Sequence, residues 1–299
     1  RRTMTKSSWY QLSPEPQRNQ YRLTPVSPSG VGFLDQASAL ASNGSKLFVS
    51  SVQGHLAALD LNPDTLAFTP GAEVNASLAY QTLSPFWLGG QLHLLAYTRD
   101  GGILDFFRVS ATDLQHLYRY QRTYGDTTIG FTTVHAFGYR DRCLFMGYNA
   151  NTGTSRIYGI QVPPQAPLSI SLLWQSEWAK GWQDFCFFQL GGENFFFKHN
   201  PAYQAVNIDH YMDDPAQGSH PVGTGLPLPQ ETSAAATLTL QEGPGFAGYR
   251  ADNGLLTVNR FHSDCQGWQQ QAQLQAGRDY SHLLAIPCGG GKSLLALYG

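Results

Sequence analysis

The feature that most constrains the fold is a pattern that recurs about every fifty residues. It is clearest from Trp174 to Ile208, where an apolar run, the turn Gly191-Gly192, a second apolar run, a polar turn and an alternating run follow one another. Two strands joined by a Gly-Gly turn, with a third strand after a short turn, form an antiparallel meander. One residue closes the second run of each unit and marks the register; these residues are Ser51, Tyr97, Tyr148, His199, Tyr249 and Tyr298.

The spacing of these marker residues predicts a closed ring. Successive markers lie 46, 51, 51, 50 and 49 residues apart, and the step from Tyr298 through both chain ends back to Ser51 is 52 residues. A period of this length, with Gly-rich hairpins and four strands in each unit, is typical of a β-propeller. The sequence therefore predicts an all-β fold, a six-bladed β-propeller of four-stranded antiparallel blades.

The tight turns of the repeat support this interpretation. The first strand of each blade is expected near residues 38–42, 86–88, 134–137, 185–190, 235–240 and 283–286. The turns that follow these strands are Asn43-Gly44, Gly89-Gly90, Arg140-Asp141, Gly191-Gly192, Glu242-Gly243 and Gly289-Gly290. All but one contain glycine, because hairpins of this kind need a positive φ that other residues resist.

The last unit ends after its second strand, and the N-terminal residues are expected to complete it. The segment from Trp9 to Leu12 reads as a third strand, and the segment from Tyr21 to Val26 reads as a fourth. Sharing one blade between the chain ends would remove exposed sheet edges and fix both termini. We therefore expect one domain, 1–299, with blades near 33–81, 82–132, 133–183, 184–232, 233–281 and 282–299 plus 1–32.

Composition argues against some classes of partner. The net charge is −2 and only 13% of residues are charged, so no general attraction to nucleic acid is expected. No apolar run reaches the roughly 18 residues that a membrane span needs. The N-terminal residues lack a signal-peptide core. We expect an extracellular or secreted monomer, in the form of a mature protein or an excised domain.

The cysteines allow two interpretations. Cys265 is expected in a loop of the fifth blade and Cys288 beside a turn of the sixth, at the same end of the ring. A disulfide between them is one possibility, and four free thiols are the other. Cys143 and Cys186 are expected at opposite ends of their blades, where a bridge would be strained. Spacing of the C-x-x-C kind is absent, so no metal or other cofactor is predicted.

Sequence signatures of catalysis are hard to find. Neither G-x-S-x-G nor H-E-x-x-H occurs. The run from Gly289 to Ser293 ends like a phosphate-binding loop, but Ile286 stands where the first glycine belongs, and the run lies between strands. Acid pairs from different blades could still meet across the channel. We predict a non-catalytic protein, with this alternative left open.

A resemblance to known proteins narrows the functional prediction. The string Trp174-x3-Trp178-x3-Trp182, followed by apolar runs around Gly191-Gly192, resembles repeats in bacterial and fungal β-propellers. These include fucose-binding propeller lectins and propeller modules of secreted toxins. The resemblance covers all six repeats in pattern, but it is close in residues only in the fourth, and the fifth has Ala234 to Ala236 in place of aromatics. It implies a glycan-binding module; the alternatives are a protein-interaction domain of a larger secreted or toxin-like protein and a channel-mouth glycoside hydrolase.

The ligand site is expected at the end of the ring where the second strand leads to the third and one blade leads to the next. A tyrosine offers a sugar a flat apolar face and a hydroxyl, and the alternative role for such residues is packing at the strand ends. The first candidate site is therefore the set of markers Tyr97, Tyr148, His199, Tyr249 and Tyr298.

Two further candidate sites lie at the same end. Trp178 and Trp182 are close enough in sequence to hold a sugar ring between them, or else to fill the space between adjacent blades. An arginine beside an aspartate can bind vicinal hydroxyls, although the same residues are common in tight turns. The third set of candidates is therefore Arg99, Asp100, Arg250 and Asp252.

Overall fold

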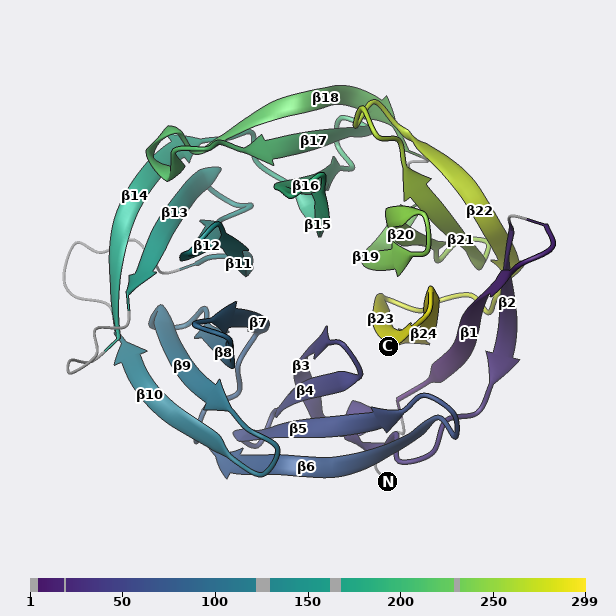
Figure 1. The fold of residues 1–299 in the computed structure, drawn as a ribbon, viewed down its shortest axis with the longest axis horizontal. Coiled ribbons are helices and arrows are strands. Elements are labelled where there is room, and N and C mark those ends of the chain that lie inside the picture. Colours follow the sequence, from purple (N-terminus) through teal and green to yellow (C-terminus); the bar gives the residue numbers. More distant parts are fainter. Residues whose placement is uncertain (1–4, 19, 122–129, 162–167, 229–231) are drawn as a thin grey trace.

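The computed structural model describes residues 5–18, 20–121, 130–161, 168–228 and 232–299. These residues form six four-stranded antiparallel sheets arranged as the blades of a ring (Figure 1). The strand that comes first in each blade lies innermost, and the fourth lies at the rim. The predicted fold class, a six-bladed β-propeller, is confirmed.

The strands follow one another around the ring in chain order. The first blade contains β3 (Ala37–Asn43), β4 (Lys46–Ser51), β5 (His55–Asn62) and β6 (Ala67–Asn75), and the second contains β7 (Thr82–Leu88), β8 (Gln91–Thr98), β9 (Ile103–Val109) and β10 (Leu114–Tyr120). The third contains β11 (Thr133–Tyr139), β12 (Arg142–Tyr148), β13 (Thr154–Gln161) and β14 (Ser169–Glu177), and the fourth contains β15 (Gln183–Leu190), β16 (Glu193–Asn200), β17 (Ala205–Tyr211) and β18 (Ser219–Pro227). The fifth contains β19 (Thr232–Leu240), β20 (Gly243–Arg250), β21 (Leu255–Phe261) and β22 (Trp268–Gln275), and the sixth contains β23 (His282–Gly289), β24 (Lys292–Tyr298), β1 (Ser7–Glu15) and β2 (Gln20–Val26). Two short 3-10 helices, η1 (Gly32–Gln36) and η2 (Pro215–Gln217), connect strands.

Burial within a blade follows from its position between two neighbours. In β8 every residue after Gln91 is buried, because both faces of this second strand are covered by adjacent blades. In the fourth strand β22, most side chains are partly or fully exposed, since the rim faces solvent. The uninterrupted apolar runs in the sequence are therefore the second strands, which form the core.

The N-terminal strands complete the sixth blade. The order of strands in this sheet is β2-β1-β24-β23, and β1 pairs with β24 from Ser7 opposite Tyr298 to Leu12 opposite Ser293. The side chain of Leu12 has no exposed surface, and those of Trp9 and Tyr10 are buried. The predicted closure of the ring by strands from both chain ends is confirmed.

The junction between the third and fourth blades is filled with aromatic rings. The inner strands β11 and β15 approach each other less closely than the inner strands at the other junctions. His135 stacks on Phe187 with ring centres 3.6 Å apart, and Phe137 stacks on Tyr211 at 4.1 Å. The aromatic residues that distinguish the fourth repeat therefore fill a wider gap between blades.

The four cysteines are free thiols. The disulfide between Cys265 and Cys288 that the sequence allowed is not formed, and the alternative of four free thiols describes the structure. Burial raises the pKa of Cys265 to about 11 and also raises the pKa of Cys186. A thiol with a raised pKa stays protonated near neutral pH, and a protonated thiol is a poor nucleophile.

Two features are absent from the described residues. No helix there is long and apolar enough to cross a membrane. No group of three or more His, Cys, Asp or Glu side chains in the same residues is placed to hold a metal ion.

Deleting residues 1–12 should open the ring. The deletion removes the pairing partner of β24 together with Trp9, Tyr10 and Leu12, and large buried side chains cost about 2–5 kcal/mol each when lost. We expect the free energy of unfolding to fall by at least about 5 kcal/mol, with aggregation through the exposed edge of β24. Denaturant unfolding and light scattering measure both effects. Deleting only residues 1–4, which precede β1, is the control, and equal stability of the two truncated proteins would contradict the closure.

Candidate functional site

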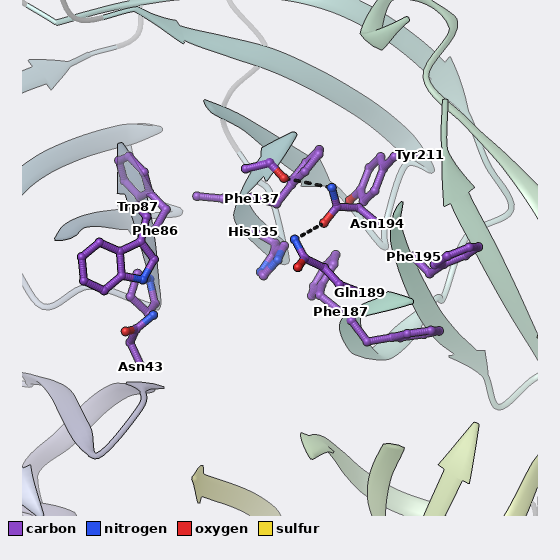
Figure 2. A pocket seen from close by; sticks show the side chains of 14 residues that line it. Asn43, Phe86, Trp87, His135, Phe137, Phe187, Gln189, Asn194, Phe195 and Tyr211 are labelled. Carbon is purple, nitrogen blue, oxygen red and sulfur yellow. Dashed lines mark hydrogen bonds between the residues drawn. The ribbon is translucent and has the colours of Figure 1, made fainter. Parts of the chain in front are cut away.

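A cavity of about 300 Å³ opens near the centre of the ring, at the end where the first strand of each blade turns into the second (Figure 2). Most of its walls come from the inner strands of neighbouring blades, with further residues from β16 and β17, so the closed ring brings together residues that are far apart in sequence. The lining side chains shown in Figure 2 include Asn43, Phe86, Trp87, His135, Phe137, Phe187, Gln189, Asn194, Phe195 and Tyr211.

Trp87 gives this cavity an exposed aromatic surface. It lies on β7 two residues before the Gly89-Gly90 turn, and 57% of its surface is accessible. A large aromatic side chain exposed to this extent is uncommon, because its burial elsewhere would be favourable. Asn43, at the end of β3, lies beside Trp87 in the same wall (Figure 2). Within the described residues, its side-chain amide has no hydrogen-bond partner.

Two amide side chains form a relay across the junction of the third and fourth blades. The Gln189 Nε2 group donates to Asn194 Oδ1 at 3.1 Å, and the Asn194 Nδ2 group donates to the Gly138 carbonyl at 2.9 Å (Figure 2). Because Gln189 uses its NH₂ group here, its carbonyl oxygen remains as an acceptor at the cavity. The relay thus fixes a polar group beside the aromatic wall.

His135 is neutral in this cavity. Its ring is stacked between apolar groups, and burial lowers its pKa from the ordinary value of 6.5 to about 3. Desolvation is the cause, since an imidazolium ion loses its hydration when it is buried. Near neutral pH the ring therefore adds no charge to the cavity.

The cavity as a whole is uncharged. Among the described residues that line it there is no Asp, Glu, Lys or Arg. Pairs of carboxyl groups about 5–10 Å apart are the usual requirement for glycoside hydrolysis, and this lining does not provide them. A flat indole beside fixed amides suits a ligand with apolar CH faces and neutral hydroxyl groups.

The tyrosines predicted as a sugar-binding ring are instead buried between blades. Tyr97, Tyr148 and Tyr249 have no exposed surface. The Tyr148 hydroxyl accepts the Trp182 N–H at 3.2 Å and donates to the Ala179 carbonyl at 2.8 Å. We call this contact, in which a tyrosine hydroxyl bonds to the backbone that opens the next blade, the blade latch.

The blade latch recurs at other junctions. The Tyr97 hydroxyl accepts the Phe131 N–H at 3.0 Å, and the Tyr249 hydroxyl accepts the Tyr280 N–H at 3.3 Å. With their rings fully buried, these tyrosines have no face on which a sugar could stack. This corrects the expectation that they form a ligand platform, and the cause is that the second strand of each blade is covered on both sides.

The remaining marker residues are also held by local contacts. His199 has no exposed surface, and its Nδ1 lies 3.2 Å from Asp184 Oδ2. Tyr298 is partly exposed and stacks on His282 with ring centres 5.0 Å apart. The structure therefore does not gather the marker residues into one pocket.

The two tryptophans between the third and fourth blades enclose a buried lysine. The Lys198 Nζ atom lies 3.6 Å from the centre of the Trp178 ring and 4.6 Å from that of Trp182. It also donates to Asp209 at 3.0 Å, and burial lowers its pKa. These contacts fit the role of filling the space between blades, which was the alternative to sugar binding.

The polar turn residues remain accessible but are separated. Arg99 and Asp100 are exposed on the second blade, whereas Arg250 and Asp252 form an ion pair of 3.4 Å within a turn of the fifth. All four lie at the end of the ring opposite the cavity. A ligand role for them stays a prediction, and the structure does not bring them together.

The cavity residues were not predicted from the sequence, because the ligand was expected at the other end of the ring. Trp87 had a usable signal, since a tryptophan two residues before a Gly-Gly turn lies near the end of its hairpin, where few residues of that hairpin can cover it. The grouping of Gln189 with Asn43 had no such signal, because it depends on how blades are placed around the ring.

Comparisons with known proteins add information about the fold. No family model matches the chain, and no curated protein matches it. A "putative 6-phosphogluconolactonase" from Bacteroides fragilis has 10% sequence identity, and the match covers 96% of this chain and 86% of that one with a TM-score of 0.54. A Lactobacillus plantarum protein has 12% identity, with 94% and 86% covered and a TM-score of 0.54. A second "putative 6-phosphogluconolactonase", from Bacteroides uniformis, has 10% identity, with 98% and 81% covered and a TM-score of 0.51.

The six four-stranded sheets define the chain as a six-bladed β-propeller, and these similarities show the fold alone. Two of the three similar structures carry the name of a sugar-phosphate enzyme, and none of the three is named as a lectin or a toxin module. The expected relationship to propeller lectins is therefore supported only at the level of the propeller fold.

The blade latch predicts the effect of removing one hydroxyl. Tyr148→Phe keeps the buried ring but leaves the Trp182 N–H and the Ala179 carbonyl without their partner. We expect the free energy of unfolding to fall by about 1–3 kcal/mol. Tyr298→Phe is the matched control, because in the described part of the chain no hydrogen bond of the Tyr298 hydroxyl is found. Equal unfolding curves for the two variants would argue against the latch.

Neutral His135 predicts a loss of stability in acid. Its folded-state pKa lies below the unfolded value, so the unfolded chain binds the extra proton between about pH 3 and 6.5. The free energy of unfolding should therefore fall as pH decreases through this window. His135→Phe should show a shallower decrease, whereas His262→Phe, at an exposed position, should behave like the wild type. Parallel pH profiles for the wild type and His135→Phe would show that this group does not titrate as described.

Proposed function

We propose that this protein is a non-catalytic glycan-binding module that holds a neutral sugar in the cavity at the channel mouth. The observation that carries the proposal is the exposed ring of Trp87 beside an uncharged cavity lined with amides. An indole face packs against the CH groups of a sugar, while amide oxygens and NH₂ groups bond to its hydroxyls. Asn43 and the carbonyl oxygen of Gln189 supply such groups on either side of the opening.

The chemistry of the lining argues against the enzymatic alternatives. A glycoside hydrolase needs an acid and a base or nucleophile at the bond that it cleaves, and no carboxyl group lines this cavity in the described residues. The names of two similar structures suggest a phosphorylated sugar lactone as another candidate ligand. A phosphate group favours arginine or lysine, and neither lines the cavity.

A protein-interaction domain would need a different kind of surface. Such surfaces depend on several clustered large side chains that become fully desolvated. The large exposed apolar side chains here are dispersed, with Val52 and Tyr203 at the end opposite Trp87. The cavity with its single exposed indole fits a small polar ligand better.

Replacing Trp87 tests the proposal. Trp87→Ala should weaken glycan binding by about tenfold or more, as for the loss of a central aromatic contact. Its unfolding temperature should change little, because the side chain is 57% exposed. Glycan-array screening followed by calorimetry provides the measurement. Tyr203→Ala, which removes a ring that is 67% exposed at the other end of the ring, is the matched control and should retain binding.

Three results would overturn the proposal. The first is the absence of binding to any glycan by the wild type, and the second is equal loss in Trp87→Ala and Tyr203→Ala. The third is turnover of sugar lactones or glycosides that is abolished by His135→Phe, since that would assign the cavity to catalysis.

A further inference from the structure

The cavity at the channel mouth is the first of three neighbouring hollows at the same end of the ring. The second hollow, of about 380 Å³, lies among the turns of the second, third and fourth blades and shares Trp87, Gln189 and Asn194 with the first. The third, of about 530 Å³, shares Asp141 and Arg142 with the second. Because each hollow shares lining side chains with the next, the three lie in a row, and we call this row the groove.

The middle of the groove carries groups that bind hydroxyls without imposing a net charge. Asp141 and Arg142 are exposed neighbours in the turn of the third blade. Arg140, in the same turn, lies 3.6 Å from Asp213, so its charge is balanced by that carboxylate. A carboxylate accepts two hydroxyl hydrogens and a guanidinium group donates to two oxygens. This part of the groove therefore matches pairs of neighbouring hydroxyl groups.

The outer end of the groove lies on the outer strands of the third blade. Gly159 on β13 and Ser171 on β14 pair across the sheet there. A Cβ atom at Gly159 would lie 3.3 Å from the Leu173 side chain and 3.4 Å from Ser171 Oγ. The absence of a side chain at Gly159 thus keeps the groove open, and Gln161 beside it provides another amide.

We propose that the groove binds a linear, uncharged oligosaccharide, with one sugar unit on Trp87 in the channel cavity and the chain running outward to Ser171. This inference rests on the proposed function and adds the length and direction of the ligand. Three observations support it: the hollows adjoin one another, their lining combines aromatic, amide and paired charged groups, and the third hollow is larger than the first. A single monosaccharide would leave the middle and outer hollows empty.

Blocking the outer end separates this proposal from simple monosaccharide binding. Ser171 is exposed, so Ser171→Trp should fill the third hollow without disturbing the core. Leu172→Trp is the matched control, because Leu172 is the next residue of the same strand, is 47% exposed and does not line the groove. Calorimetry would use a series of one to five units of the neutral glycan identified on the array, with a uronic-acid oligomer as a charged comparison.

We expect the wild-type affinity to rise about tenfold or more from one unit to three or four and then to level off. Ser171→Trp should lose this gain while keeping the affinity for the single unit, and Leu172→Trp should match the wild type. An affinity independent of chain length, or unchanged in Ser171→Trp, would overturn the extended site while leaving the cavity on Trp87 in place. Tighter binding of the uronic-acid oligomer would overturn the uncharged ligand class. Failure of every glycan to bind would instead reject the proposed function itself.

Discussion

The pairing of β1 with β24 is the interaction on which the rest of the structure depends. Each blade buries its second strand only because another blade covers each of its faces. A ring with one incomplete blade would expose a sheet edge and uncover the blades on both sides. The pairing of β1, from Ser7 to Leu12, with β24, from Tyr298 to Ser293, therefore holds in place surfaces that are far from either chain end.

Within the closed ring, two kinds of contact hold neighbouring blades together. Tyrosine hydroxyls bond to the backbone that begins the next blade, as Tyr148 does with Trp182, and stacked aromatic rings fill the wider junction between the third and fourth blades. The wider junction leaves room at its inner end for the cavity, and the relay from Gln189 through Asn194 bridges it. The cavity is thus a product of unequal spacing around a nearly regular ring.

Much of the fold was predictable from the sequence, because it depends on local signals. The Gly-Gly turns, the spacing of the marker residues and the wrap-around from Tyr298 to Ser51 indicated six blades and the closure. The role of the markers was harder to predict. A tyrosine at the end of a strand can face solvent or the next blade, and only the placement of the Phe131, Trp182 and Tyr280 backbone amides decides between them.

The candidate site was less predictable than the fold. Trp87, Gln189 and Asn43 come from three different blades, and their meeting depends on the rotation between blades rather than on any sequence spacing. The pKa of His135 likewise depends on its stacking against Phe187, a residue of the next blade. The candidate site lies at a junction between blades, where a repeat pattern carries the least information.

The closing pair of strands also has a consequence for synthesis. The ribosome makes β1 before the other strands of this ring, yet its partner β24 emerges only after the other blades have been made. Until then Trp9, Tyr10 and Leu12 are without the neighbours that bury them in the finished ring. Contacts between residues so distant in sequence form late and slowly. While the intervening blades are made, β1 therefore has β2 on one edge and no partner on the other, which makes the nascent ring a candidate for protection by chaperones until β24 emerges.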